Sequence, residues 1–103
     1  MSIDVAVVGS CNLDLVVKVD AIPLVGQTVL GGDLEQIPGG KGANQAVATS
    51  RLGYSSVFIG RVGDDDNGKF LKQCLREDNV DTSFLFETED VPSGIAMIAV
   101  QAD

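Results

Sequence analysis

The feature that most constrains this sequence is a glycine-rich run at residues 39–42, Gly-Gly-Lys-Gly, which is followed by ten residues without glycine or proline. Glycine lets the backbone adopt positive φ angles and approach a ligand closely. Residues 43–52 predict a helix, because Arg51 stands in the last turn and Gly53 occupies a C-cap position. The first N–H groups of such a helix have no intrahelical partner and are available to a polar ligand.

One face of this predicted helix carries only small side chains. They recur at helical spacing and are Ala43, Ala46, Val47 and Ser50. A helix with so small a face can lie very close to a sheet. We therefore expect the helix to pack directly on neighbouring strands.

The glycine-rich run does not match two common nucleotide-binding motifs. A Walker A loop requires glycine five residues before its Gly-Lys pair and Ser or Thr after it, but Glu35 and Gly42 stand there. A dinucleotide fingerprint requires a third glycine, which is absent after Asn44. Spacing alone therefore leaves two interpretations open, a ligand site or a tight strand-to-helix turn without a ligand.

A second segment, residues 63–68, contains three consecutive aspartates and invites comparison with a calcium loop. An EF-hand loop needs Asp at its first position and Glu at its twelfth, whereas Gly63 and Cys74 stand there. We expect these acidic residues instead to cap and favour the N-terminus of the helix that follows.

The periodicity of apolar residues predicts alternating strands and helices. The expected strands cover residues 5–8, 13–20, 28–37, 56–59, 83–87 and 95–100, and the expected helices cover residues 43–52 and 67–78. This order indicates a mostly parallel sheet with helices packed on it. The strand at 13–20 alternates apolar and polar residues, so its hairpin with 28–37 should stand off as a flap.

Three of these elements carry definite burial predictions. The strands at 5–8 and 95–100 are apolar on both faces, so we expect both faces to be covered. The helix at 67–78 should bury one apolar stripe. The stripe consists of Phe70, Leu71, Cys74 and Leu75.

Charge and cysteine content exclude several classes of protein. The formal net charge of −8 argues against nucleic acid and anionic membranes as partners, since both need a basic surface. Cys11 and Cys74 match no metal-binding or disulfide spacing, which is typical of reduced thiols in a cytoplasmic protein. The sequence shows no signal-peptide pattern and no apolar run of membrane-spanning length.

Several residues carry groups suited to a ligand with vicinal hydroxyls, which both donate and accept hydrogen bonds. Asp14 can accept from two neighbouring hydroxyls, Asn12 and Asn44 can do both, and Lys41 can donate. Each charge-assisted bond contributes about 1.5–3 kcal/mol. Taken alone, Asp14 is better explained as a solvated strand carboxylate, Lys41 as a surface lysine and Asn44 as a helix-start residue.

Three segments, in order, resemble the ribokinase family, also called the phosphofructokinase-B-like carbohydrate kinases. They are Gly9-Ser10-Cys11-Asn12-Leu13-Asp14, Pro23-Leu24-Val25-Gly26-Gln27-Thr28 and Gly39-Gly40-Lys41-Gly42-Ala43-Asn44-Gln45-Ala46, the last followed by Gly53 and Gly63. The resemblance implies a ribokinase-like α/β fold, a mostly parallel sheet flanked by helices with a small β-sheet lid. Residues 1–103 would be the N-terminal part of one such domain, with lid strands at about 13–37 and 94–101 and no second domain.

The resemblance also implies a sugar-binding role for nine positions. They are Asn12, Asp14, Gly40, Lys41, Gly42, Ala43, Asn44, Ala96 and Ile98. Ala96 and Ile98 would make apolar contact with the sugar from a lid strand. The lid would also pair with a second subunit through the row Leu13, Leu15, Val17 and Val19, although packing within the chain explains this row equally well.

The activity implied by the resemblance is ATP-dependent phosphorylation of D-ribose to D-ribose 5-phosphate by a homodimer that uses Mg²⁺ and K⁺. The catalytic aspartate, the nucleotide pocket and the potassium site would lie beyond Asp103, where the sequence breaks off directly after an apolar segment as if cut. Two alternatives stay open. One is a sibling kinase acting on deoxyribose, fructose or a nucleoside, and the other is a non-catalytic sugar-binding or dimerising fragment.

Overall fold

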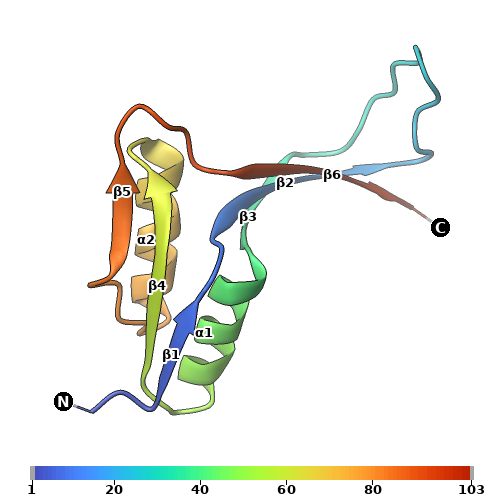
Figure 1. Ribbon diagram of the computed structural model, residues 1–103. Helices are drawn as coiled ribbons and strands as arrows, with labels where there is room; N and C mark the ends of the chain where they lie inside the picture. Colours follow the sequence, from blue (N-terminus) through green and yellow to red (C-terminus); the bar gives the residue numbers. More distant parts are fainter. Residues whose placement is uncertain (1, 103) are drawn as a thin grey trace.

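The computed structural model describes residues 2–102, which fold into two three-stranded sheets and two helices (Figure 1). In chain order the elements are β1 (Val5–Val8), β2 (Asn12–Val19), β3 (Glu35–Gly39), α1 (Lys41–Arg51), β4 (Ser56–Gly63), α2 (Asp66–Glu77), β5 (Leu85–Thr88) and β6 (Ile95–Gln101). We call β1, β4, β5 and the two helices the body, and β2, β3 and β6 the second sheet. Asp103, where a break was expected, lies outside the described residues.

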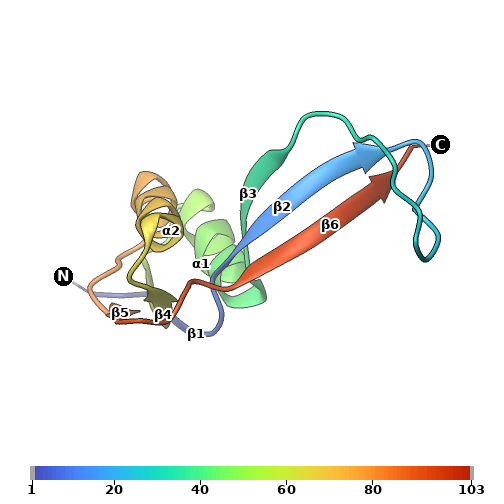
Figure 2. The same cartoon turned by 90° about the horizontal axis from the view of Figure 1, so that it is seen from above.

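The sheet of the body has the strand order β1-β4-β5, and its strands are parallel. In its register Val7 lies beside Phe58, and Gly60 lies beside Leu85. The helices α1 and α2 connect successive strands and lie on the same face of the sheet (Figure 2). When right-handed crossovers add successive parallel strands in one direction across a sheet, the connecting helices all lie on the same face of that sheet. The predicted parallel sheet with packed helices is therefore confirmed.

The core of the body lies between this sheet and the two helices. Phe58 of β4 and Leu71 of α2 are fully buried there. Ala43 and Ala46 of α1 face the sheet, as the small-residue face predicted. The close approach lets the Ser56 hydroxyl on β4 donate to the Ala46 carbonyl at 2.9 Å. Small side chains thus bring α1 within hydrogen-bonding distance of the strand beneath it.

No helix among residues 2–102 lies on the opposite face of the same sheet. Val8 is 77% exposed on this face, and the guanidinium of Arg61 lies 5.4 Å from the ring centroid of Phe86. The prediction that residues 5–8 are buried on both faces is therefore wrong for the described part of the chain. Only Val7 is buried, because both helices lie on its side of the sheet.

The second sheet has the order β3-β2-β6 and extends away from the body (Figure 1). β2 pairs antiparallel with β3 and parallel with β6. The predicted alternation of β2 is present: Leu13 is 1% exposed and joins the core of the body, whereas Asp14 points to the other face and is half-buried. Leu13 therefore fastens the root of the second sheet to the body.

The partner strand of β2 is shorter than predicted. A strand was expected at residues 28–37, but β3 covers only Glu35–Gly39, and residues 20–34 form a long loop. Within this loop Gly32 donates its N–H to the Lys18 carbonyl at 2.8 Å, so the segment touches β2 without continuing the ladder. The two adjacent glycines in the loop favour this irregular path, since glycine weakens a strand interior.

The prediction that both faces of β6 are covered is also wrong for the described residues. Met97 on one face is 82% exposed, and Ile98 on the other face is exposed as well. Within residues 2–102, β6 pairs with no strand but β2, in a sheet that stands away from the body. An apolar strand at such a position has no element of residues 2–102 to cover it.

The start of α2 is capped as predicted. The Asp65 carboxylate accepts a hydrogen bond from the Gly68 N–H at 2.8 Å. The buried side of α2 contains Leu71 and Leu75, but Phe70 is 39% exposed, so its predicted burial is wrong. Phe70 is one position from Leu71 and therefore points about 100° away from the buried stripe. Neither α1 nor α2 is long and apolar enough to cross a membrane.

Candidate functional site

The start of α1 is held in place by the loop that follows β1. Gly40 is the N-cap residue and has a φ of 103°, a conformation that side-chain-bearing residues rarely adopt. A Cβ on Gly40 would lie 2.5 Å from the Ser10 carbonyl oxygen. The same Ser10 oxygen accepts from the Ala43 N–H at 3.1 Å. The helix start and the end of β1 therefore form one rigid corner.

Close backbone contacts tighten this corner further. A Cβ on Gly42 would lie 2.8 Å from the Gly9 Cα, and a Cβ on Gly60 would lie 2.9 Å from the Gly9 carbonyl oxygen. The three backbones can meet only because none of them carries a side chain. The sequence signal for this crossing is a glycine directly after each short apolar run, at positions 9 and 60.

Asn12 and Asp14 form a hydrogen-bonded pair at the start of β2. The Asn12 Nδ2 donates to the Asp14 Oδ1 at 2.7 Å. The carboxylate lies over the backbone of Gly39 on the neighbouring strand, where a Cβ would be 2.6 Å from the Asp14 Oδ2. Both side chains are half-buried, so each keeps surface for a ligand. Gly39, to which the sequence analysis gave no separate role, is what makes room for Asp14.

The register of the second sheet places two apolar residues of β6 next to this pair. Asp14 lies beside Ala96, and Val16 lies beside Ile98, so Ala96 and Ile98 are on the face of the sheet that carries Asp14. Ile37 lies beside Asp14 on its other side. The carboxylate is therefore flanked by aliphatic side chains, which lower the local polarity. Ile37 was not among the residues that the sequence suggested.

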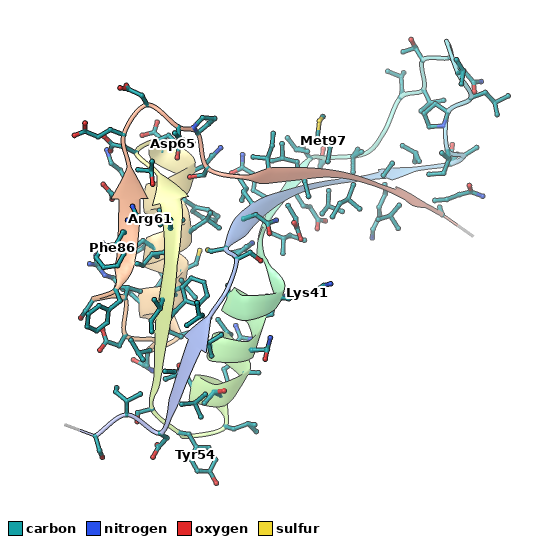
Figure 3. The ribbon with its side chains drawn as sticks, viewed as in Figure 1. Lys41, Tyr54, Arg61, Asp65, Phe86 and Met97 are labelled. Atoms are coloured by element: carbon teal, nitrogen blue, oxygen red, sulfur yellow. The ribbon has the colours of Figure 1, made fainter. Side chains whose placement is uncertain are left out.

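The remaining candidate residues belong to the first turn of α1 and differ in what they can offer. The side chains of Lys41 and Asn44 are exposed, and Figure 3 shows Lys41 extending away from the body. Gly42 and Ala43 are buried, so they can reach a ligand only through the backbone. The Ala43 N–H already donates to Ser10. The donors that remain at this helix start are the Lys41 ammonium, the Asn44 side-chain amide and the backbone amides that precede Ala43.

A cavity of about 270 Å³ lies between α1 and α2, next to this cluster. The candidate residues Ala43 and Asn44 border it, as does Ile37, and much of its lining is apolar. At its rim Arg51 of α1 forms a two-pronged ion pair with Asp78, with Nε–Oδ1 and Nη2–Oδ2 distances of 2.8 and 3.1 Å. The Asp78 carboxylate in this cavity is paired with Arg51, whereas the Asp14 carboxylate in the cluster has no such ion pair among residues 2–102.

Both cysteines border the same cavity as free thiols. Burial raises the pKa of the Cys11 thiol to about 11, and the proximity of Cys74 adds to the shift. Burial is also the largest cause of the raised pKa of Cys74, followed by the negative charges of Glu77 and Asp78. Thiols with raised pKa values are poor nucleophiles at neutral pH. Neither cysteine is therefore a candidate for covalent chemistry.

The described residues contain no cluster of metal-ligating side chains. Between residues 2 and 102 no group of three or more His, Cys, Asp and Glu side chains is arranged to hold a metal ion. The candidate site is thus composed of one carboxylate, two amides, an ammonium, backbone donors and aliphatic contacts. This composition suits an uncharged, polyhydroxylated ligand.

Comparison with known protein families and sequences gives a consistent result. A model of the pfkB family of carbohydrate kinases matches residues 2–103. Ribokinase from Bacillus subtilis is 43% identical over 97 residues, which are 94% of this chain and 33% of that protein. Ribokinase from Lactococcus lactis is 44% identical over 103 residues, covering 96% and 33% respectively. An Arabidopsis thaliana protein named "Probable fructokinase-7" is 40% identical over 87 residues, covering 82% and 25%.

Solved structures agree. A structure of Arabidopsis thaliana ribokinase complexed with ribose and ATP superposes with a TM-score of 0.86 at 33% identity, covering 100% of this chain and 34% of that one. Giardia lamblia ribokinase gives a TM-score of 0.88 at 33% identity, covering 97% and 31%. These similarities confirm the predicted ribokinase-like α/β fold. The chain spans about a third of the length of these relatives.

Proposed function

Because this chain belongs to the pfkB family of carbohydrate kinases, we propose that it is the sugar-binding, N-terminal portion of an ATP-dependent ribokinase. The intact protein would transfer the γ-phosphate of ATP to D-ribose and release D-ribose 5-phosphate. The similarity to two bacterial ribokinases over nearly the whole chain supports this choice of substrate. The residues that recognise the sugar are proposed to lie in the part described above.

The observation that carries the proposal is the geometry around Asp14. Its carboxylate is positioned by Asn12, lies over the bare backbone of Gly39 and stands beside Ala96. A carboxylate held in this way can accept hydrogen bonds from two vicinal hydroxyls of one sugar ring. Each charge-assisted bond contributes about 1.5–3 kcal/mol, which is enough for useful affinity and for a choice between epimers.

The other candidate residues complete the proposed sugar site. Asn12 and Asn44 can each donate to and accept from hydroxyls, and the Lys41 ammonium donates. Backbone groups at Gly40, Gly42 and Ala43 shape the floor of the site, whereas Ala96 and Ile98 contact the apolar face of the sugar from β6. Aliphatic contact of this kind excludes water, which strengthens the polar contacts beside it.

The second sheet is proposed to act as a lid over the sugar. It is joined to the body through its root at Leu13, and both of its faces carry exposed apolar residues. Closure of the lid would exclude water, so that ATP is not hydrolysed without a sugar acceptor. The lid of a second subunit would cover the exposed Ile95 and Met97 in a homodimer.

The nucleotide and ion sites are proposed to lie in another part of the protein. The family resemblance implies Mg²⁺ and K⁺. Between residues 2 and 102, however, no group of three or more His, Cys, Asp and Glu side chains is arranged to hold a metal ion. We therefore assign to this part of the chain no step that involves an ion. The catalytic base and the ATP pocket are likewise proposed to follow Asp103, in a protein located in the cytoplasm.

A sibling sugar specificity is the second candidate function. The similarity to the Arabidopsis fructokinase relative at 40% identity favours it, since the same fold serves more than one sugar. The geometry around Asp14 suits any ring with adjacent hydroxyls. The choice between ribose and its competitors therefore rests on measurement.

The deciding experiment is ATP turnover by the protein made from the complete reading frame, with ribose, deoxyribose, fructose and adenosine as acceptors. Turnover with ribose at the highest kcat/KM is the expected outcome. A higher kcat/KM with another acceptor would show that ribose is not the preferred substrate, but the proposed phosphoryl transfer from ATP to a sugar would stand. No turnover with any acceptor, in the presence of magnesium and potassium, would favour a non-catalytic sugar-binding or dimerising fragment.

A further inference from the structure

A partly buried polar cluster joins the start of α2 to the root of β6. Ser93, which is 6% exposed, donates its hydroxyl to the Asp65 Oδ1 at 2.7 Å and its N–H to the Asp65 Oδ2 at 2.8 Å. The Ser93 Oγ in turn accepts from the Gly63 N–H at 2.9 Å. Asp65 also caps α2 through Gly68. One carboxylate and one hydroxyl therefore bind the end of β4, the start of α2 and residue 93 together.

The backbone packs so closely around this cluster that Gly63 and Gly68 have no room for a side chain. A Cβ on Gly63 would collide with the backbone of Val91 and Ser93, and a Cβ on Gly68 would collide with the Gly63 carbonyl. Residue 93 is therefore held by backbone contact on several sides as well as by hydrogen bonds. Figure 3 shows Asp65 at the end of the body from which the chain passes into β6.

Only one residue, Gly94, separates this cluster from the start of β6. The carbonyl of Gly94 accepts from the Leu13 N–H at 2.9 Å, which begins the pairing of β6 with β2. Two positions further on, Ala96 lies beside Asp14. β6 has no strand partner but β2 within residues 2–102. The position of Ser93 therefore sets where β6 begins and how Ala96 stands against Asp14.

We propose that Asp65 and Ser93 are positioning residues that anchor the root of β6 and so set the apolar wall of the sugar site. This role rests on the proposed function, because it acts through Ala96 and Ile98 on the bound sugar. Neither side chain touches the candidate site itself. The rival explanation is that the pair stabilises α2 in the manner of any helix cap.

A second Asp–Ser pair in the chain serves as a control that tests this rival explanation. Asp81 accepts from both the N–H and the hydroxyl of Ser83, at 2.8 and 2.6 Å, so this exposed serine makes the same two donations to an aspartate that the buried Ser93 makes. This second pair lies before β5 in the body and has no connection to the second sheet. Removing either serine hydroxyl deletes the same kind of bond, but only Ser93 adjoins β6.

The first test compares Ser93→Ala and Ser83→Ala in the full-length protein by steady-state kinetics. Loss of a hydrogen bond that orders β6 should raise the KM for ribose about tenfold in Ser93→Ala. The KM for ATP should change by less than about twofold, since the nucleotide lies elsewhere. Ser83→Ala should leave both constants as in the wild type. Asp65→Asn serves as the second variant if Ser93→Ala does not fold.

The second test is hydrogen exchange, which needs no activity. Amides of residues 94–101 should exchange at least about fivefold faster in Ser93→Ala, while those of β4 and α1 keep their wild-type rates. Faster exchange throughout the body, or the same change in Ser83→Ala, would overturn the proposal in favour of a purely structural cap. Unchanged exchange in β6 would overturn it as well.

The two tests separate this inference from the proposed function. If the wild-type protein does not phosphorylate ribose, the proposed function fails, and exchange in β6 alone decides the anchoring role. If ribose is phosphorylated and Ser93→Ala leaves both its KM and the exchange of β6 unchanged, the proposed function stands and the anchoring role is overturned.

Discussion

At the scale of single residues, Asp14 shows how a carboxylate on a strand differs from a solvated one. Asn12 donates to it at 2.7 Å, and Gly39 leaves the space into which it fits. Ala96 and Ile37 flank it from the two neighbouring strands. A carboxylate fixed in this way loses little further rotamer entropy when it accepts hydrogen bonds, so more of the bond energy appears as affinity.

We therefore expect Asp14→Asn to weaken ribose binding. Replacing the charged acceptor by a neutral amide should raise the KM for ribose about ten- to a hundredfold, with the KM for ATP nearly unchanged. Asp20→Asn, at an exposed position just after the far end of β2, is the matched control and should behave as the wild type. Wild-type sugar kinetics for Asp14→Asn would remove Asp14 from the site.

Asp65 should make stability depend on acid pH. Hydrogen bonds from the Ser93 hydroxyl, the Ser93 N–H and the Gly68 N–H lower its pKa in the folded protein below the usual 3.8. Because the folded pKa lies below the unfolded one, this stabilisation is complete above pH 3.8 and is lost as the pH falls through the lowered folded pKa. The free energy of unfolding should therefore decrease in that acid range.

Urea unfolding between neutral and acid pH measures this effect. In Ser93→Ala the pKa of Asp65 should move back toward its usual value, because the largest cause of the shift is removed. The acid-dependent loss of stability should then be smaller than in the wild type. Identical pH profiles for the two proteins would show that the Ser93 bonds do not set the pKa of Asp65.

At the scale of elements, the start of α1 depends on one backbone conformation. Gly40 caps the helix at a φ of 103°, and Gly53 follows its end at a φ of 94°. The two glycines differ in their surroundings: a Cβ on Gly40 would meet the Ser10 carbonyl oxygen at 2.5 Å, whereas a Cβ on Gly53 would meet nothing within 4 Å. Substitutions at Gly40 and Gly53 therefore distinguish the cost of a positive φ angle from the cost of steric crowding.

Gly40→Ala and Gly53→Ala test this difference. Gly53→Ala should cost about 1–2 kcal/mol of unfolding free energy from the positive φ alone. Gly40→Ala should cost more, because its methyl group also displaces the loop that fixes the helix start, and it should raise the KM for ribose as well. Equal losses in the two variants, measured by urea unfolding, would contradict the crowding at Ser10.

At the scale of the whole molecule, the described chain exposes apolar surface on two sheets. Val8 lies on the uncovered face of the body and Met97 on the second sheet, and both are more than three-quarters exposed. The molecule measures 53 × 34 × 18 Å and is therefore elongated and thin. Exposed apolar strands at sheet edges favour association with other chains.

Residues 1–103 expressed alone should therefore self-associate, as measured by sedimentation velocity. Val8→Lys should reduce association by placing a charge on the uncovered face. Ala48→Lys, on the exposed side of α1, adds the same charge away from that face and should leave association unchanged. A wild-type chain that sediments as a monomer would contradict this expectation.

Much of the fold could be predicted because its determinants are local. The helix predicted at 43–52 is observed at Lys41–Arg51, and the cap of α2 was predicted from the aspartates before it. Helix periodicity, capping and glycine conformation involve residues within one or two turns of each other. The same holds for the clustering of Asn12 with Asp14, two residues apart on one strand.

What only the tertiary structure decided depends on residues far apart in the sequence. The register that puts Ala96 beside Asp14 joins segments separated by two helices and three strands, and the bonds from Ser93 to Asp65 join segments separated by one helix and one strand. Burial was mispredicted for Val8 and for β6 for the same reason. An apolar pattern identifies which side of a strand avoids water, but the elements that cover that side are set by how the whole chain packs.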